Sequence, residues 1–220
     1  MRILMRLFGV LLISAAVVLF FWQDIQEYFT DRVNDRIIEG FYNGDENIEI
    51  AWWERLITGI DSYDGNAARA DTDGQGVRLG ENMTGILNVP SANISEPVFG
   101  GELTEEKLRN GLSFVHDDDH IDMQNIPIAG HRVEGAGIRF NNLDEAEIGD
   151  AIEFVTREGT REYVITSIEY VDPTAVEVMA QNPDPDAVQE LTLITCDDYN
   201  PETLLWETRM IVKAELVVEG

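Results

Sequence analysis

Cysteine is almost absent from this chain: its 220 residues include one, Cys196. A single cysteine cannot form an internal disulfide, which excludes the cross-linked framework of small secreted domains. A lone cysteine is most often a small buried hydrophobe. Cys196, however, ends the apolar, β-branched run at residues 191–195 and precedes a polar stretch at 197–200, where a strand can present a side chain on a rigid support. We therefore take it as a candidate nucleophile.

Positive charge is also scarce. Lysine and arginine number 15 against 42 aspartates and glutamates, so the formal net charge is -27. A surface of this sign repels phosphate backbones and anionic lipid headgroups outside a specific pocket. We therefore expect no nucleic-acid partner. The hydrophobic content of 44% is sufficient for a core, and the length suits one ordinary domain with an appendage.

Long apolar runs are confined to the start of the chain. Residues 3–22 are uncharged apart from Arg6, are long enough to cross a bilayer and end in the aromatic triplet Phe-Phe-Trp. Because Arg2 and Arg6 precede the apolar core, the positive-inside rule places the N-terminus in the cytoplasm and the rest outside the cell membrane. A cleaved signal peptide is the alternative, but the bulky triplet differs from a small-x-small cleavage site. We predict a single-pass anchor over residues 1–22.

An extracellular stalk and linker are predicted over residues 23–81. From 23 to 55, apolar residues recur near helical spacing among charged ones, which indicates an amphipathic, solvated helix. Trp52 and Trp53 suit either the membrane interface or the surface of the domain. Residues 61–80 are rich in Gly, Asp, Asn and Ala, which predicts a flexible linker.

Strand signals follow closely over residues 82–220. Residues 151–155 and 161–166 flank a Glu-Gly turn typical of a β-hairpin, and the last run, 208–218, alternates apolar and polar residues. Thr104 can cap one short helix. The domain is therefore predicted to be all-β with one or two short helices. A closed barrel is one way for such a sheet to remove its edges.

Three polar residues stand at predicted strand ends: His131, Cys196 and Arg209. An ionised cysteine is a nucleophile, a histidine can hold or relay its proton, and an arginine can bind a developing oxyanion. Arg209 follows Cys196 after a hairpin-length loop, which indicates neighbouring strands. His131 is distant in sequence, so only the fold can bring it to the other two.

The chain resembles the class A sortases over the whole predicted domain. The resemblance rests on Ile-Ala-Gly-His at 128–131, Leu-Thr-Leu-Ile-Thr-Cys at 191–196 and Trp-Glu-Thr-Arg at 206–209. The sequence Thr-Cys-Asp-Asp-Tyr-Asn around the cysteine is similar to the staphylococcal-type housekeeping enzymes. The resemblance implies a closed eight-stranded β-barrel as the catalytic domain, with a membrane anchor and a helical stalk before it. It also implies a cysteine transpeptidase that cleaves the LPXTG-type sorting signal of surface proteins between Thr and Gly.

Each role implied by the resemblance falls on a matched residue. Cys196 attacks the Thr carbonyl as a thiolate and forms a thioacyl enzyme. His131 donates a proton to the leaving amine and later takes one from the acceptor, an amino group of a lipid II-type cell-wall precursor. Arg209 stabilises the oxyanion or orients the signal. Thr195, beside the nucleophile, helps to position the carbonyl.

The resemblance also suggests an apolar groove for the Leu and Pro of the signal. Its predicted lining is Ala129, Val176, Val178, Met179, Ile194 and Trp206. Apolar residues at these positions are equally compatible with the core of a barrel.

Some staphylococcal-type members bind an activating calcium ion between two loops, and this chain departs from their pattern. His116 and Met123 stand where carboxylates are expected, and Gln181 replaces a third. Asp119 and Asp122 remain as candidates, but calcium needs several oxygen ligands. We predict weak or no calcium dependence and no required cofactor.

Two alternatives stay open. One is another cysteine enzyme of the cell wall: a membrane-anchored peptidase, or an L,D-transpeptidase, although the Ser-His-Gly-Cys pattern of the latter is missing. The other is a catalytically silent β-domain that binds wall components.

Overall fold

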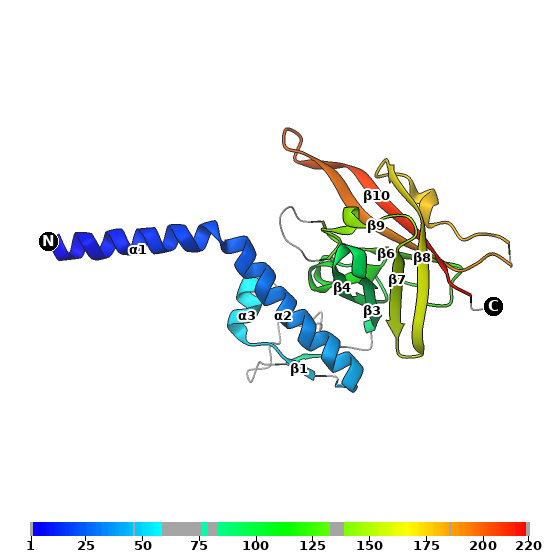
Figure 1. The fold of residues 1–220 in the computed structure, drawn as a ribbon, viewed down its shortest axis with the longest axis horizontal. Helices are drawn as coiled ribbons and strands as arrows, with labels where there is room; N and C mark the ends of the chain where they lie inside the picture. The colour runs from blue at the N-terminus through cyan, green and yellow to red at the C-terminus, as the bar shows by residue number, and fades with distance from the viewer. Residues whose placement is uncertain are drawn as a thin grey trace.

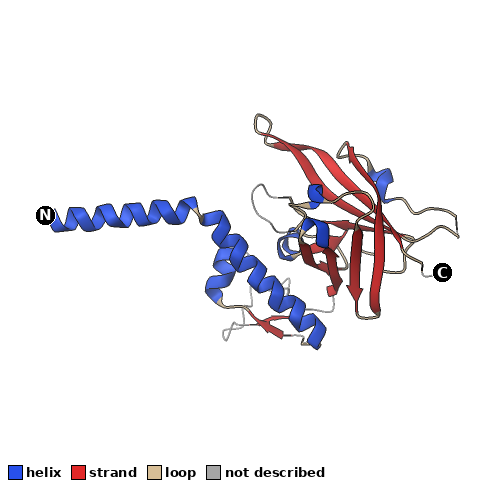
Figure 2. Ribbon diagram, in the orientation of Figure 1, coloured by secondary structure: helices blue, strands red, loops and turns tan. Residues whose placement is uncertain are grey.

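The computed structural model describes residues 2–45, 47–58, 76–78, 83–132, 139–184 and 186–218. The N-terminal part contains three helices: α1 (Arg2–Phe20), α2 (Trp22–Asn43) and α3 (Trp52–Thr58). Helix α1 projects away from the rest of the molecule (Figure 1), and all strands except those of a small two-stranded sheet gather on the far side of α2 from α1 (Figure 2).

The predicted membrane anchor falls on α1. No single helix among the described residues is long and apolar enough to cross a membrane. Two consecutive helices, Met5–Phe20 and Trp22–Asn43, are together long and apolar enough to cross a membrane. They are bent by 58° at the break between them. The single-pass anchor over residues 1–22 therefore stays a prediction.

Most of the predicted linker at 61–80 lies outside the described residues. Its residues 76–78 form β2 (Gly76–Arg78), which pairs antiparallel with β1 (Asn47–Glu49). This small sheet joins the segment that follows α2 to the segment that precedes the main body of strands.

Eight strands close into a barrel in the order β10-β8-β7-β3-β4-β5-β6-β9. All neighbours are antiparallel except β4 with β5 and β6 with β9, which are parallel. The predicted closed eight-stranded barrel is confirmed. The short helix α4 (Glu105–Asn110) and three 3-10 segments lie between strands. The strands are β3 (Met83–Val89), β4 (Ile94–Phe99), β5 (Leu112–Phe114), β6 (Asn125–Ala129), β7 (Ala151–Thr156), β8 (Gly159–Val171), β9 (Glu190–Asn200) and β10 (Leu205–Leu216).

The barrel interior is filled by alternate residues of its strands. In β10, Met210, Val212 and Ala214 are buried in the main core, as the alternation in the sequence predicts. In β7, Ile152 and Phe154 are buried, while Glu153 between them is exposed. Alternation thus decides which face of each strand turns inward, because side chains on a strand have a period of two.

Helix α2 is not solvated on all sides, so that part of the stalk prediction is wrong. Its residues Val33 and Ile37 are fully buried in a second cluster with Met83, Ile86 and Phe99 of the barrel. The two helical residues are four apart and so share one face, and this face packs against an apolar surface on β3 and β4. Burying each such side chain stabilises the docked helix by about 1.5–3 kcal/mol.

A buried charged group reinforces this contact. Glu96 on β4 accepts a hydrogen bond from the Asn34 amide of α2 at 3.0 Å. It also accepts one from the Arg139 backbone N–H at 2.8 Å and another from the Arg139 guanidinium. The same guanidinium donates to the carbonyl of Arg109 at the end of α4. Glu96 therefore joins the stalk helix to the segment that follows His131.

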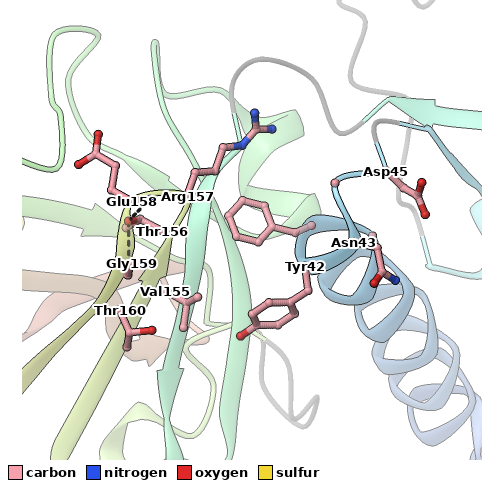
Figure 3. A pocket seen from close by; sticks show the side chains of 12 residues that line it. Tyr42, Asn43, Asp45, Val155, Thr156, Arg157, Glu158, Gly159 and Thr160 are labelled. Atoms are coloured by element: carbon pink, nitrogen blue, oxygen red, sulfur yellow. Dashed lines mark hydrogen bonds between the residues drawn. The ribbon is translucent and has the colours of Figure 1, made fainter.

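A groove of about 650 Å³ lies between the C-terminal end of α2 and the β7–β8 turn (Figure 3). Residues 40–45 line one wall and 155–160 the other. The guanidinium of Arg157 stands 5.9 Å from the centre of the Phe41 ring. None of the predicted site residues lines this groove.

Candidate active site

Strands β9 and β10 bring the candidate nucleophile and the candidate arginine together. In their antiparallel pairing, Arg209 lies directly opposite Cys196. Residues opposite each other in such a pair project to the same face of the sheet. Both residues are half-buried. The prediction that they lie on neighbouring strands is confirmed.

His131 reaches the same place through the parallel pairing of β6 and β9. The last paired residues are Ala129 and Ile194, and the Gly130 amide donates to the Ile194 carbonyl at 3.1 Å. Parallel strands advance in step. His131 and Cys196, each two residues beyond that last pair, therefore lie at the same edge of the barrel.

Cys196 lies inside β9 rather than at its end, so the predicted strand boundary was wrong. Strand β9 continues to Asn200, which pairs with Leu205 at the start of β10. The side chains at 197–200 are polar, but their backbones find cross-strand partners, and pairing of the backbone is what extends a strand. The cysteine is thus held by a strand ladder and not by a loop.

The backbone of His131 is held by Phe140. The Phe140 N–H donates to the His131 carbonyl at 3.1 Å. The Phe140 ring packs so closely on Gly130 that a Cβ added there would stand 2.5 Å from the ring and 2.6 Å from the Leu112 side chain. Only glycine allows this approach next to the histidine.

Replacing Gly130 with alanine is expected to lower the free energy of unfolding by about 1–3 kcal/mol, because the new methyl group overpacks the core. It also displaces His131, so kcat should fall more than KM rises. Urea unfolding and steady-state kinetics measure the two effects. Gly9→Ala, where an added Cβ meets nothing within 4 Å, is the matched control and should behave as wild type. An active, fully stable Gly130→Ala variant would contradict the packing argument.

Glu105 is a site residue that the sequence reasoning missed. Its carboxylate Oε2 lies 3.3 Å from His131 Nε2. It opens α4, whose preceding residue Thr104 accepts the Lys107 N–H as the predicted cap. The Glu105 side chain is 73% exposed, so solvent screens the pair with His131 and leaves it little stabilising energy. Nothing in the local sequence distinguishes Glu105 from other acids in a first helical turn.

The charges around Cys196 set the protonation of its thiol. Burial raises the pKa of the Cys196 thiol above its usual value, the Arg209 guanidinium opposes the rise, and the Glu105 carboxylate adds to it. The balance is a raised pKa, so the protonated thiol prevails at neutral pH. A neighbouring proton acceptor is then needed to form the nucleophile.

Replacing Glu105 with glutamine is expected to shift the pH profile of Cys196 alkylation by iodoacetamide to lower pH. The thiolate is the reacting form, and removal of a negative charge lowers the thiol pKa. Arg209→Met should shift the profile the other way. Glu102→Gln, a carboxylate that is not among the charges shifting the Cys196 pKa, should leave it in place. A shift of the Glu105→Gln profile to higher pH would contradict this electrostatic account.

Four more of the predicted site residues lie on β6, β9 and β10, the strands that position His131, Cys196 and Arg209. Ala129 and Ile194 face each other across β6 and β9, and both are half-buried. Trp206 on β10 lies opposite Tyr199, with ring centres 5.2 Å apart. Thr195 is buried, and its hydroxyl donates to the Gly130 carbonyl at 2.9 Å, next to the histidine.

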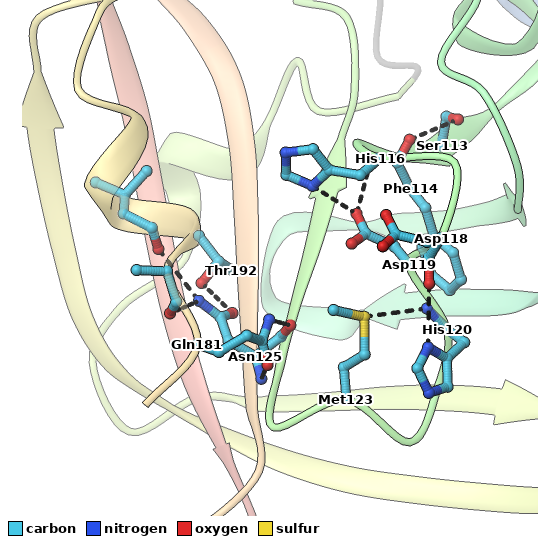
Figure 4. A network of polar contacts seen from close by, with 12 residues as sticks. Ser113, Phe114, His116, Asp118, Asp119, His120, Met123, Asn125, Gln181 and Thr192 are labelled. Carbon is cyan, nitrogen blue, oxygen red and sulfur yellow. Dashed lines mark hydrogen bonds and ion pairs between the residues drawn. The ribbon is translucent and has the colours of Figure 1, made fainter. Parts of the chain in front are cut away.

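The remaining groove residues form a 3-10 segment (Val176–Met179) before β9. Val176 is 67% exposed, which is unusual for a core residue and fits a surface groove better. Val178 and Met179 are half-buried. The Asn125 amide of β6 donates to the Val178 carbonyl at 3.2 Å and so holds the segment against the barrel (Figure 4).

The predicted calcium candidates already have protein partners. Asp119 accepts the His116 N–H at 2.7 Å and lies 3.1 Å from its ring nitrogen (Figure 4). Asp122 accepts from the Arg161 guanidinium at 2.7 Å. Gln181 exchanges two hydrogen bonds with the backbone of β6. Across the described part of the chain, three or more His, Cys, Asp or Glu residues do not gather in a way that could hold a metal ion.

Comparison with known proteins identifies the family. The family model described as the Sortase domain matches residues 87–217, more than half of the chain. The chain belongs to the sortase family. It is 35% identical over 212 residues to sortase A of Staphylococcus aureus. That match covers 96% of this chain and 95% of the Staphylococcus aureus protein. It is 27% identical over 152 residues to sortase A of Listeria monocytogenes, and that match covers 69% of this chain and 60% of the Listeria protein.

Solved structures agree with this assignment. The structure of Listeria monocytogenes sortase A superposes with a TM-score of 0.55 at 27% identity and covers 63% of this sortase and 89% of that chain. A Clostridium perfringens sortase D5 superposes with a TM-score of 0.57, and the match covers 85% of this sortase and 99% of that chain. At 21% identity this second match shows the fold alone. The predicted family is confirmed, and this sortase is a cysteine transpeptidase built on the sortase barrel.

Proposed function

We propose that this sortase cleaves an LPXTG-type sorting signal between Thr and Gly and joins the Thr carbonyl to an amino group of a lipid II-type cell-wall precursor, which anchors surface proteins to the wall. One observation carries the proposal. Arg209 lies opposite Cys196 across the β9–β10 pair, and His131 lies at the same edge, two residues beyond the end of β6. A nucleophile, a proton carrier and a cation are the groups that acyl transfer through a thioester needs.

The reaction then has two halves. His131 takes the proton of the Cys196 thiol, and the thiolate attacks the Thr carbonyl carbon. The tetrahedral intermediate then collapses to a thioester as His131 gives that proton to the departing Gly amine. In the second half, the precursor amine attacks the thioester carbon, His131 takes a proton from that amine, and the Cys196 thiolate leaves. Each half forms one bond to the carbonyl carbon and breaks another, so the enzyme is regenerated.

Arg209 carries the electrostatic part of the reaction. Arginine keeps its positive charge at any working pH, and Arg209 lies opposite Cys196, so its charge can stabilise the oxygen that becomes negative when the thiolate adds to the carbonyl carbon. The apolar residues beside it, with exposed Val176 at one side, hold the Leu and Pro of the signal. Thr195 supports the site through its bond to the Gly130 carbonyl.

The anchor and the cofactor requirement complete the proposal. Helix α1 spans the cell membrane with the N-terminus in the cytoplasm, as the arginines before its apolar core favour, and the barrel stands outside. The enzyme works without calcium, because Asp122 is held by Arg161 and Asp119 by His116. A large rise in turnover when calcium is added to chelated enzyme would contradict that part.

The test uses the full chain in detergent with labelled LPXTG peptides and a panel of primary amines, with products identified by mass spectrometry. We expect cleavage between Thr and Gly, and ligation that replaces hydrolysis as the amine concentration rises. Equal cleavage of a scrambled peptide would overturn the proposed specificity. Hydrolysis without ligation to any amine would favour a cell-wall peptidase, and inertness towards every peptide would favour a silent binding domain.

A further inference from the structure

Helix α3 presents an apolar face to solvent. Trp52 is 71% exposed, Leu56 is 75% exposed and Trp53 is 39% exposed. Trp52 and Leu56 are four residues apart on a helix and therefore lie on one face, with Trp53 adjoining. We call these three residues the α3 face. Three large apolar side chains on a helix of seven residues are more than the scattered exposure normal for a soluble surface.

Negative charge is absent from the exposed side of α3. Its one acidic residue, Glu54, is 5% exposed. The Glu54 carboxylate lies 2.8 Å from the Arg36 guanidinium and accepts the Ala51 N–H at 2.9 Å. In a chain with a formal charge of -27, the α3 face is thus an uncharged patch. Such a patch can approach a bilayer without placing an acidic group against lipid headgroups.

Helix α3 runs along the part of α2 next to α1. The Gln26 amide donates to the Ile57 carbonyl at 3.0 Å, and the Phe29 and Trp53 rings stand 5.2 Å apart. Gln26 is about 6 Å along the helix from Trp22, where α2 begins. Figure 1 shows α3 beside the first half of α2, on the side that faces away from the barrel.

The bend between α1 and α2 keeps α3 close to the level at which α1 leaves the bilayer. Helix α2 departs from the direction of α1 by 58°. If α1 stands along the bilayer normal, α2 rises by about 0.8 Å per residue instead of about 1.5 Å. Gln26 and Phe29, which contact Ile57 and Trp53 of α3, then stay within about 10 Å of the end of α1, which is the depth of the headgroup region where Trp side chains concentrate.

We propose that the α3 face rests on the outer surface of the lipid bilayer and gives the enzyme a second membrane contact besides α1. The proposal rests on the proposed anchoring by α1. A single helix lets the barrel swing about its end, whereas two contacts fix its orientation. Because α2 is docked on the barrel through Val33, Ile37 and Asn34, the orientation passes to the active site. The attraction is hydrophobic, so it should not weaken when salt screens charges.

The test places a spin label at one position at a time in the full chain, in a Cys196→Ala background, reconstituted in phosphatidylcholine vesicles with a minor fraction of phosphatidylglycerol. Labels enter as Leu56→Cys on the α3 face, Tyr42→Cys near the far end of α2, and Leu11→Cys in α1. Each native residue is more than half exposed, so the labels do not disturb packing. Collisions with oxygen and with a water-soluble nickel complex report the depth of each label.

We expect the label at position 56 to be several-fold less accessible to nickel than the label at 42, at low and high salt alike. The label at 11 should be accessible to oxygen and not to nickel. Nickel access at 56 equal to that at 42, with 11 buried in lipid, would overturn the α3 contact while leaving the anchor intact. A nickel-accessible label at 11 would refute the anchor, and the contact with it. Dipolar broadening between labels at 56 would overturn the lipid contact in favour of a second copy of the chain.

Discussion

Replacing Cys196 with alanine is expected to reduce transpeptidation by on the order of 10⁶-fold, as in other enzymes that lose a covalent nucleophile. Without the thiol no thioester forms, and water or an amine would have to attack the peptide bond directly. Neither His131 nor Arg209 depends on the thiol for its position: the Arg209 backbone belongs to the β9–β10 ladder, and the His131 carbonyl is held by the Phe140 N–H. The loss should therefore fall on kcat, while sorting peptides still bind.

Release of the labelled Gly-containing product measures the rate, and fluorescence anisotropy measures peptide binding. The half-buried thiol is small, so the change should cost about 1 kcal/mol of stability or less. Alkylation of the wild-type enzyme, whose one cysteine is Cys196, is the matched chemical control and should abolish turnover equally. An unchanged rate of cleavage in Cys196→Ala would refute the proposed function.

Replacing Glu96 with glutamine is expected to lower the free energy of unfolding by about 3–5 kcal/mol, the usual cost of removing one partner of a buried ion pair. The Glu96 and Arg139 side chains are 5% and 2% exposed. Arginine cannot lose its charge, so the variant leaves an uncompensated guanidinium in the interior. Urea denaturation of the full chain in detergent measures the effect. The variant should also lose kcat, because Arg139 directly precedes the Phe140 N–H that holds the His131 carbonyl.

Glu190→Gln is the matched control. It removes the carboxylate that lies 2.8 Å from Lys213 Nζ on the barrel surface, where the side chains are 20% and 26% exposed. Solvent reaches both groups, so the expected loss is about 1 kcal/mol or less. A double variant, Glu96→Leu with Arg139→Met, should recover part of the stability because it removes both buried charges. Equal losses in Glu96→Gln and Glu190→Gln would contradict the role of burial.

Local pattern predicted the barrel strands well. The hairpin expected around the turn at 158–159 is β7 and β8, and the alternating run near the C-terminus is β10. The cap expected at Thr104 begins α4. Boundaries were less accurate: β9 runs past Cys196, and β8 is longer than its apolar part. The reason is that strand length follows backbone pairing with a neighbour, which polar side chains do not prevent.

The sequence did not predict the contacts between distant segments of the chain. Asn34, Glu96 and Arg139 come from three separate parts of the chain, and nothing around any of them indicates the other two. The docking of α2 was missed for the same reason, because an amphipathic helix reveals that it has an apolar face but not what covers it. The partners of Asp119 and Asp122 likewise depend on how two loops meet the barrel.

The sequence alone determined that the chain carries an acidic all-β domain behind an apolar segment, with one cysteine and an arginine on adjacent strands. Those properties depend on residue types and on spacing along a short stretch, which the chain order contains directly. Only the tertiary structure decided that β6 lies parallel to β9, that Glu105 approaches His131 and that α2 docks on the barrel beside the buried Glu96. These depend on which segments become neighbours, a choice made by burial and pairing over the whole molecule.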